Sequence, residues 1–95
     1  MKPAKIISFE DFDKIRKNLG KIVCTSGGFD PIHPGHVSCI HESKKYGDTV
    51  VVIVNGDNFL KTKKGKPFMD VKTRCHIVSY VIGVDYVIPF EIEND

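Results

Sequence analysis

The stretch Ser26–His36 reads SGGFDPIHPGH, and the rest of the chain can be understood outward from it. The residues just before it, 21–25, are apolar and β-branched, which predicts a short strand that ends at the glycine pair. Pro34 has the fixed φ angle that suits the first position of a helix, and Gly47 marks its end. The stretch is therefore predicted to be the turn between a strand and a helix over residues 34–46.

Two histidines, His33 and His36, flank the start of that helix. A helix N-terminus offers unpaired N–H groups and about half a positive charge, so it attracts anions. Residues three apart lie on one helix face, so both imidazoles can address the same anion. Gly28 and Gly35 let the backbone approach a ligand closely. A single histidine or glycine pair is usually ordinary surface structure, but the combination predicts a site for a phosphate chain.

The remaining pattern predicts an α/β fold. Residues 49–54 are continuously apolar, which is typical of a strand covered on both faces of a parallel sheet. Alternating strands and helices then predict one domain over residues 1–95, with a Rossmann-like parallel sheet and flanking helices. The other expected elements are a helix at 9–19, a mobile basic loop at 61–67, a helix at 71–82 and a strand at 86–89.

The loop resembles the H-x-G-H signature of the cytidylyltransferase-like nucleotidyltransferase superfamily. The matching residues are Gly28, Phe29, Asp30, His33, Gly35 and His36, and the resemblance covers about three quarters of the chain. Within the superfamily the chain is similar to the adenylyltransferase domain of ADP-heptose synthase and to glycerol-3-phosphate cytidylyltransferase. The resemblance implies transfer of a nucleotidyl group from ATP or CTP to a phosphorylated sugar or polyol, with release of pyrophosphate.

The resemblance also implies roles for particular residues. His33 and His36 would donate to the α-phosphate oxygens, and Lys63 would reach the triphosphate, so these three are the catalytic candidates. Magnesium would arrive with the triphosphate, and no separate protein metal site is expected, because the two histidines lack a third ligand. The nucleotide-binding candidates are Gly27, Gly28, Phe29, Asp30, His33, Gly35, His36, Asp57, Lys63, Lys66 and Arg74.

Several of these residues have a second interpretation. Asp30 can belong to the phosphate site or form an Asx-type turn before Pro31. Arg74 can contact the triphosphate or a neighbouring copy of the chain. The lysines of residues 61–66 can be an ordinary solvated loop, and an RNA site there is unlikely because no aromatic platform accompanies the charge. Asp57 follows a predicted strand, where ligands of open α/β sheets gather.

Composition narrows the class of protein. The 95 residues are 41% hydrophobic, and the net charge of +2 is too balanced to indicate a nucleic-acid or membrane-surface protein. The longest aliphatic run, 50–54, is too short to cross a bilayer, and no signal peptide is visible at the N-terminus. The three cysteines lack C-x-x-C spacing and are expected to be buried reduced thiols. These features predict a cytoplasmic protein without membrane contact.

The superfamily carries a second signature, which contacts the triphosphate, after its third strand. Residues 91–95 do not match it. We therefore expect apolar residues 22–24 to lie on an exposed sheet edge, which favours pairing with another chain and hence a homo-oligomer. The alternative to an active enzyme is a catalytically incomplete module that binds nucleotide or associates with itself.

Overall fold

The computed structural model describes residues 2–91, except for the side chains of residues 59 and 62–64. The strands are β1 (Lys5–Ile6), β2 (Ile22–Gly27), β3 (Thr49–Asn55) and β4 (Tyr86–Phe90). The α-helices are α1 (Phe9–Ile15), α2 (Pro34–Ser43), α3 (Asp57–Lys64) and α4 (Val71–Val78), and short 3-10 turns follow α1 at Arg16–Asn18 and α2 at Lys44–Tyr46.

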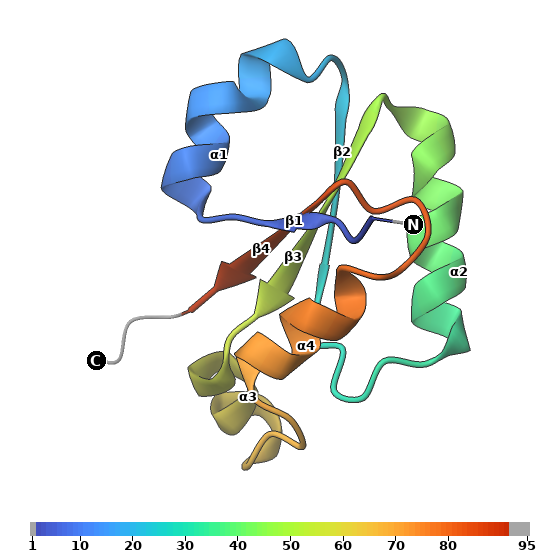
Figure 1. Cartoon of the computed structure of the whole chain (residues 1–95). Helices are drawn as coiled ribbons and strands as arrows, with labels where there is room; N and C mark the ends of the chain where they lie inside the picture. Colours follow the sequence, from blue (N-terminus) through green and yellow to red (C-terminus); the bar gives the residue numbers. More distant parts are fainter. Residues whose placement is uncertain (1, 92–95) are drawn as a thin grey trace.

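The four strands form one sheet in the order β1-β4-β3-β2, and every neighbouring pair is parallel (Figure 1). β2 pairs with β3 from Ile22 opposite Thr49 to Gly27 opposite Val54, so both strands end at the same edge of the sheet. The segments that leave this edge carry most of the predicted site residues. The parallel sheet with flanking helices confirms the predicted Rossmann-like fold class.

β3 lies between β2 and β4 and builds the core on both faces of the sheet. Val50, Val52 and Val54 are fully buried in a cluster with residues of α2 and α4, while Val51 packs on the opposite face with Phe12 of α1. Successive side chains of a strand point to opposite faces, so an unbroken run of valines serves both. Figure 1 shows α1 on one side of the sheet and α2 on the other.

The basic segment is the main departure from expectation. Residues 61–67 lack apolar periodicity and were predicted as a mobile loop, whereas α3 extends through Lys64. The helix packs through Leu60, whose exposure is 5%, and Gly65 ends it with a φ of 88°. Tertiary packing at the strand ends thus overrides a weak local pattern, and glycine supplies the left-handed residue that terminates the helix.

The other differences concern element ends and cysteines. The helices predicted at 9–19, 34–46 and 71–82 are shorter, because 3-10 turns or irregular turns replace their last residues. The short strand β1 was not predicted. The expectation of buried thiols is correct for Cys75, whose pKa burial raises to about 11, and wrong for Cys24 and Cys39, which are exposed. Cys24 lies on β2, which forms an edge of the described sheet as predicted.

Candidate functional site

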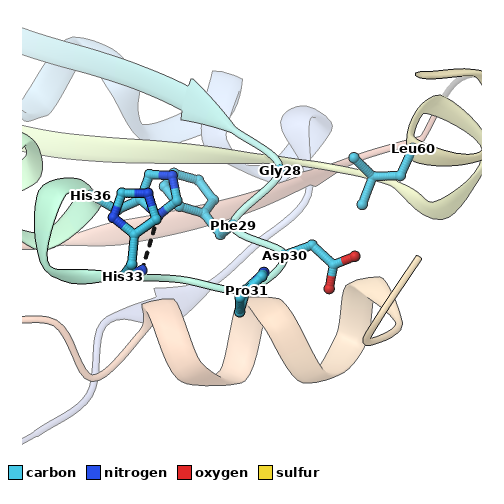
Figure 2. A pocket seen from close by; sticks show the side chains of 7 residues that line it. All are labelled: Gly28, Phe29, Asp30, Pro31, His33, His36 and Leu60. Atoms are coloured by element: carbon cyan, nitrogen blue, oxygen red, sulfur yellow. Dashed lines mark hydrogen bonds between the residues drawn. The ribbon is translucent and has the colours of Figure 1, made fainter. Parts of the chain in front are cut away.

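A pocket of about 470 Å³ opens where β2 leads into α2. The residues that line it come from the predicted loop and from α3 (Figure 2). They are Gly28, Phe29, Asp30, Pro31, His33, His36 and Leu60. The pocket therefore gathers five of the nucleotide-binding candidates (Gly28, Phe29, Asp30, His33 and His36) at the carboxyl end of the sheet, where open α/β folds bind ligands.

The two histidines cap their own helix. His33 is the N-cap of α2, and its Nδ1 accepts a hydrogen bond from the Gly35 N–H at 3.1 Å. His36 reaches back, and its Nδ1 accepts from the His33 N–H at 3.1 Å. A Cβ at Gly35 would lie 2.9 Å from Cε1 of His33, so the glycine makes room for the folded-back ring. This reciprocal arrangement is a capping box in which two imidazoles replace the usual hydroxyl and carboxylate.

The same hydrogen bonds fix where the ring protons lie. Because Nδ1 of each ring accepts an N–H, it carries no proton, and the neutral imidazole must hold its proton on Nε2. The rings of His33 and His36 stack with centroids 3.9 Å apart. Desolvation, and then the neighbouring His33, lower the pKa of His36 below 6.5. His36 therefore presents a neutral Nε2–H donor at neutral pH, beside the second ring and the helix N-terminus.

The buried ring of Phe29 packs against the His36 imidazole. The φ of Phe29 is 53°, a left-handed conformation that is uncommon for a bulky residue, and its ring is buried. The ring contacts His36 edge to face, with centroids 5.0 Å apart. The peptide bond between Asp30 and Pro31 is cis. Phe29 thus provides a buried packing surface for the His36 imidazole.

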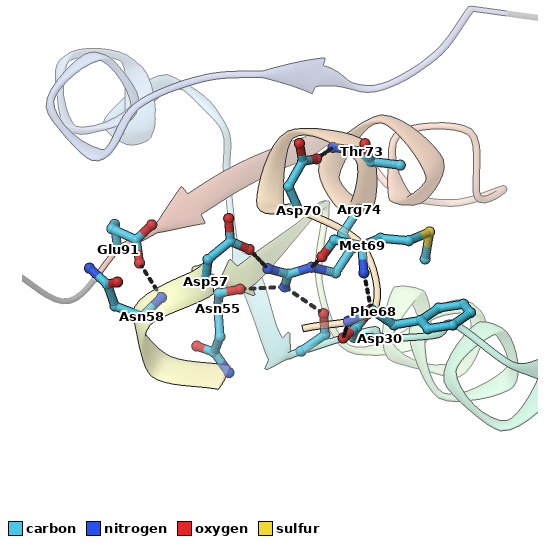
Figure 3. Close-up of polar contacts among 11 residues, drawn as sticks. Asp30, Asn55, Asp57, Asn58, Phe68, Met69, Asp70, Thr73, Arg74 and Glu91 are labelled. Atoms are coloured by element: carbon cyan, nitrogen blue, oxygen red, sulfur yellow. Dashed lines mark hydrogen bonds and ion pairs between the residues drawn. The ribbon is translucent and has the colours of Figure 1, made fainter. Parts of the chain in front are cut away.

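Asp30 links the loop to the segment before α4. Its carboxylate accepts from the main-chain N–H groups of Phe68 and Met69 (Figure 3). These two donors lie 38 and 39 residues away along the chain, and the Asx-type turn and the phosphate role considered from the sequence both stay predictions. The acidic side chain ties two distant segments together at the rim of the pocket.

Arg74 is buried completely, with an exposure of 0%. Its guanidinium donates to the carbonyl oxygens of Gly28, Asn55 and Met69 and forms an ion pair with Asp57, at 2.6 Å (Figure 3). These described partners are all internal, and the two roles considered from the sequence, contact with the triphosphate or with a neighbouring copy, stay predictions. Asp57, predicted to serve the ligand, is its carboxylate partner at the start of α3.

Among the residues with described side chains, the other predicted residues do not line the pocket. Gly27 ends β2, and Gly35 lies in the first turn of α2. Lys63 is in the last turn of α3, its side chain outside the described set, and the exposed Lys66 follows the helix. Sequence reasoning missed Leu60, which lines the pocket. Had a helix starting at Asp57 been predicted, Leu60 would have been expected on the same helix face one turn later.

No three or more histidine, cysteine, aspartate and glutamate side chains with described positions gather closely enough to hold a metal ion. Within the same residues, no helix combines the length and the apolar character needed to cross a membrane.

Comparison with known proteins supplies the family. Residues 24–94 match the model of the cytidylyltransferase-like family. The bifunctional protein HldE of Haemophilus ducreyi is 44% identical over 85 residues, covering 86% of this chain and 18% of that protein. The HldE protein of Aliarcobacter butzleri is 39% identical over 95 residues, covering 94% and 20%. The chain thus spans about a fifth of the length of these relatives.

A solved structure agrees with the sequence matches. The lipopolysaccharide core biosynthesis protein from Thermoplasma volcanium GSS1 superposes with a TM-score of 0.71 and 34% sequence identity. The superposition covers 75% of this chain and 58% of the other. The residues matched by the family model include the H-x-G-H loop, β3 and β4. The chain belongs to the cytidylyltransferase-like family.

Proposed function

We propose that the pocket binds the phosphates of ATP or CTP and that the chain takes part in nucleotidyl transfer to a phosphorylated sugar or polyol. The observation that carries the proposal is the pair of stacked imidazoles at the N-terminus of α2, each with Nδ1 engaged and the neutral-form proton on Nε2. Family membership supports the same reaction class. The name of the structural neighbour, from lipopolysaccharide core biosynthesis, supports a sugar phosphate as the acceptor.

In this reaction an oxygen of the acceptor phosphate attacks the α-phosphorus in line. The bond from that phosphorus to the bridging oxygen breaks, and pyrophosphate leaves with the electron pair. Such chemistry depends on positioning and on neutralising charge more than on covalent help. The Nε2–H groups of His33 and His36 would donate to the α-phosphate oxygens as their charge grows, and the first turn of α2 adds its own N–H groups.

The basic segment supplies the remaining charge in this proposal. Lys63 and Lys66 would meet the β- and γ-phosphates, because Lys63 lies in the last turn of the helix that carries Leu60 to the pocket and Lys66 follows just after that helix. Magnesium would enter with the triphosphate and be held by phosphate oxygens. Among the described residues that line the pocket, the one carboxylate, Asp30, already accepts two main-chain N–H groups.

ATP and the sugar phosphates are cytoplasmic metabolites, so we propose that the protein acts in the cytoplasm.

Calorimetric titration with ATP and with CTP, each with magnesium, tests the proposal. We expect one nucleotide to bind and to bind more weakly to the His36→Ala variant. His41→Ala is the matched control, because His41 is exposed on the same helix and does not line the pocket. Pyrophosphate release on adding a phosphorylated heptose or glycerol 3-phosphate then identifies the acceptor class. Absence of binding by either nucleotide would overturn the proposal.

We propose, as a second property, that the chain associates with itself through β2. The six residues of this strand pair with β3 on one side only in the described sheet, and a groove of about 320 Å³ lies beside it. The groove is lined by Phe9, Phe12, Asp13, Arg16, Ile22, Cys24, Val51, Ile53 and Ile88. An unpaired strand edge next to apolar surface favours pairing with another strand.

Sedimentation velocity of the purified chain tests this association. We expect a dimer or larger species, and we expect Cys24→Lys to shift it toward monomer, because a lysine on an edge strand opposes pairing. Cys39→Lys is the control, since Cys39 is also exposed but lies on α2. A monodisperse monomer of the unmodified chain would contradict the association.

A further inference from the structure

The buried guanidinium of Arg74 is the least expected feature of the site. Removing a charge from water is expensive, and replacing a buried ion pair by apolar residues is often neutral or stabilising. Arg74 nevertheless directs four hydrogen bonds inward, from Nε, Nη1 and Nη2. A buried charge with four directed contacts can hold the groups that it contacts in one arrangement.

Three of its four partners are main-chain carbonyls at the edge of the sheet that holds the pocket. Gly28 follows β2, Asn55 ends β3, and Met69 precedes α4. The fourth partner, Asp57, begins α3, which brings Leu60 to the pocket. One rigid planar group therefore holds together the segments that frame the pocket (Figure 3).

The bond to Gly28 has a specific consequence for the histidines. The Gly28 carbonyl belongs to the same peptide unit as the Phe29 N–H, and Phe29 has the unusual φ of 53°. Rotating that peptide unit would relieve the left-handed conformation of Phe29 but would also turn the carbonyl away from Nη1 of Arg74, now 2.8 Å from it. Arg74 thus opposes the relaxation that Phe29 would otherwise undergo.

Phe29 in turn supports His36. Its ring is buried and lies edge to face against the imidazole, so a relaxed Phe29 would withdraw the support under His36. We propose that Arg74 is a positioning residue of this pocket, whose guanidinium holds the Gly28–Phe29 peptide in place and thereby sets the His36 imidazole. The proposal deepens the proposed function, on which its kinetic consequences rest, and it adds a structural consequence that holds without any ligand.

The structural consequence is tested in the ligand-free protein by imidazole ¹H–¹⁵N spectra. Arg74→Lys keeps the charge but loses the planar fork that spans several acceptors. We expect its His36 ring signals to move, while those of the outer helix residue His41 stay. Val78→Ala is the control for a loss of core packing, because Val78 is fully buried on the same helix and does not line the pocket. It should lower the thermal midpoint without moving the His36 signals.

The kinetic consequence is a selective loss of turnover. Misplacing a catalytic group by about 1 Å can cost about 100-fold, so we expect kcat to fall by tens to 100-fold in Arg74→Lys with a smaller change in KM. Val78→Ala should keep kcat at a temperature where both variants are folded. Arg74→Gln, which removes the buried charge and keeps an amide donor, provides a second variant if Arg74→Lys fails to fold.

The two readouts separate this proposal from the one it rests on. Unmoved His36 signals in a folded Arg74 variant, or equal movement in Val78→Ala, would overturn the positioning role. A wild-type chain that binds no nucleotide would overturn the proposed function, while the ring spectra would still decide what Arg74 does.

Discussion

The helices α2 and α3 both begin at the carboxyl edge of the sheet, but different kinds of contact stabilise their first turns. Each leaves the carboxyl end of one of two neighbouring strands, and each contributes residues to the pocket. The start of α2 is capped by its own side chains, His33 and His36. The start of α3 has no side-chain cap of its own, and it relies on Glu91, which accepts the Asn58 N–H, and on Arg74.

The residues that cap α2 are proposed to act on the ligand, whereas the residues that hold the start of α3 only stabilise it. The side chains that cap α2 are also the donors proposed to meet the phosphates, so the helix start and the site are one structure. The contacts that hold α3 are made by residues 17 to 33 positions away and present nothing of their own to the pocket. Changes to α2 should therefore alter the reaction, whereas changes to the contacts of α3 should first alter stability and geometry.

The largest effect should come from removing the imidazoles while keeping the cap. In the double variant His33→Asn with His36→Gln, asparagine remains a good N-cap and glutamine can accept the N-cap N–H. We expect the pyrophosphate release rate to fall at least about 100-fold, as when an oxyanion donor is lost, with stability changed by only about 0.5 kcal/mol. Unchanged turnover in this variant would show that the histidines serve only as caps.

A smaller effect, on stability, should follow from loosening the contact between the two segments. In Asp30→Asn only one side-chain oxygen remains to accept from Phe68 and Met69, and an amide N–H faces the other donor. We expect a loss of about 1–3 kcal/mol in the free energy of unfolding, measured by urea denaturation. Asp13→Asn is the control, because the Asp13 side chain of α1 is exposed, and an equal loss there would show that the Asp30 contacts are not what stabilises the fold.

The same contrast explains what the sequence could predict. The end of β2, the loop and the start of α2 follow from neighbours within a turn: Pro34 at the first helical position and His33 three residues before His36. The roles of Arg74 and Asp57 could not be read in this way, because the arginine's partners are brought together only by the folded sheet. A local sequence pattern can predict a local structure. The contacts of a buried arginine with residues far away in the sequence become visible only in the folded chain.

The acid limb of stability should report on the α2 cap. The pKa of His36 is lowered in the fold, first by desolvation and then by His33, so the unfolded chain binds the proton more readily. The contribution of His36 to the free energy of unfolding is therefore fully present above about pH 6.5. It is lost as the pH falls from there through the lower pKa of the folded state. Protonation of Nδ1 would also break its bond to the His33 N–H. His36→Gln should remove this step from a plot of unfolding free energy against pH, and a persistent step would assign it elsewhere.

The smallest effect should be confined to α3. The Glu91 carboxylate accepts the Asn58 N–H at 3.0 Å, and the Gly56 N–H donates to the Phe90 carbonyl, so the end of β4 holds the helix start. Glu91→Ala should lose about 0.5–1 kcal/mol, as other exposed caps do, and Glu91→Gln should lose less because it keeps an acceptor oxygen. Amide exchange resolves the effect by residue. Faster exchange in the first turn of α3 with α2 unchanged would confirm that the two helix starts are held independently, and equal acceleration in α2 would show instead that the two sides of the pocket open together.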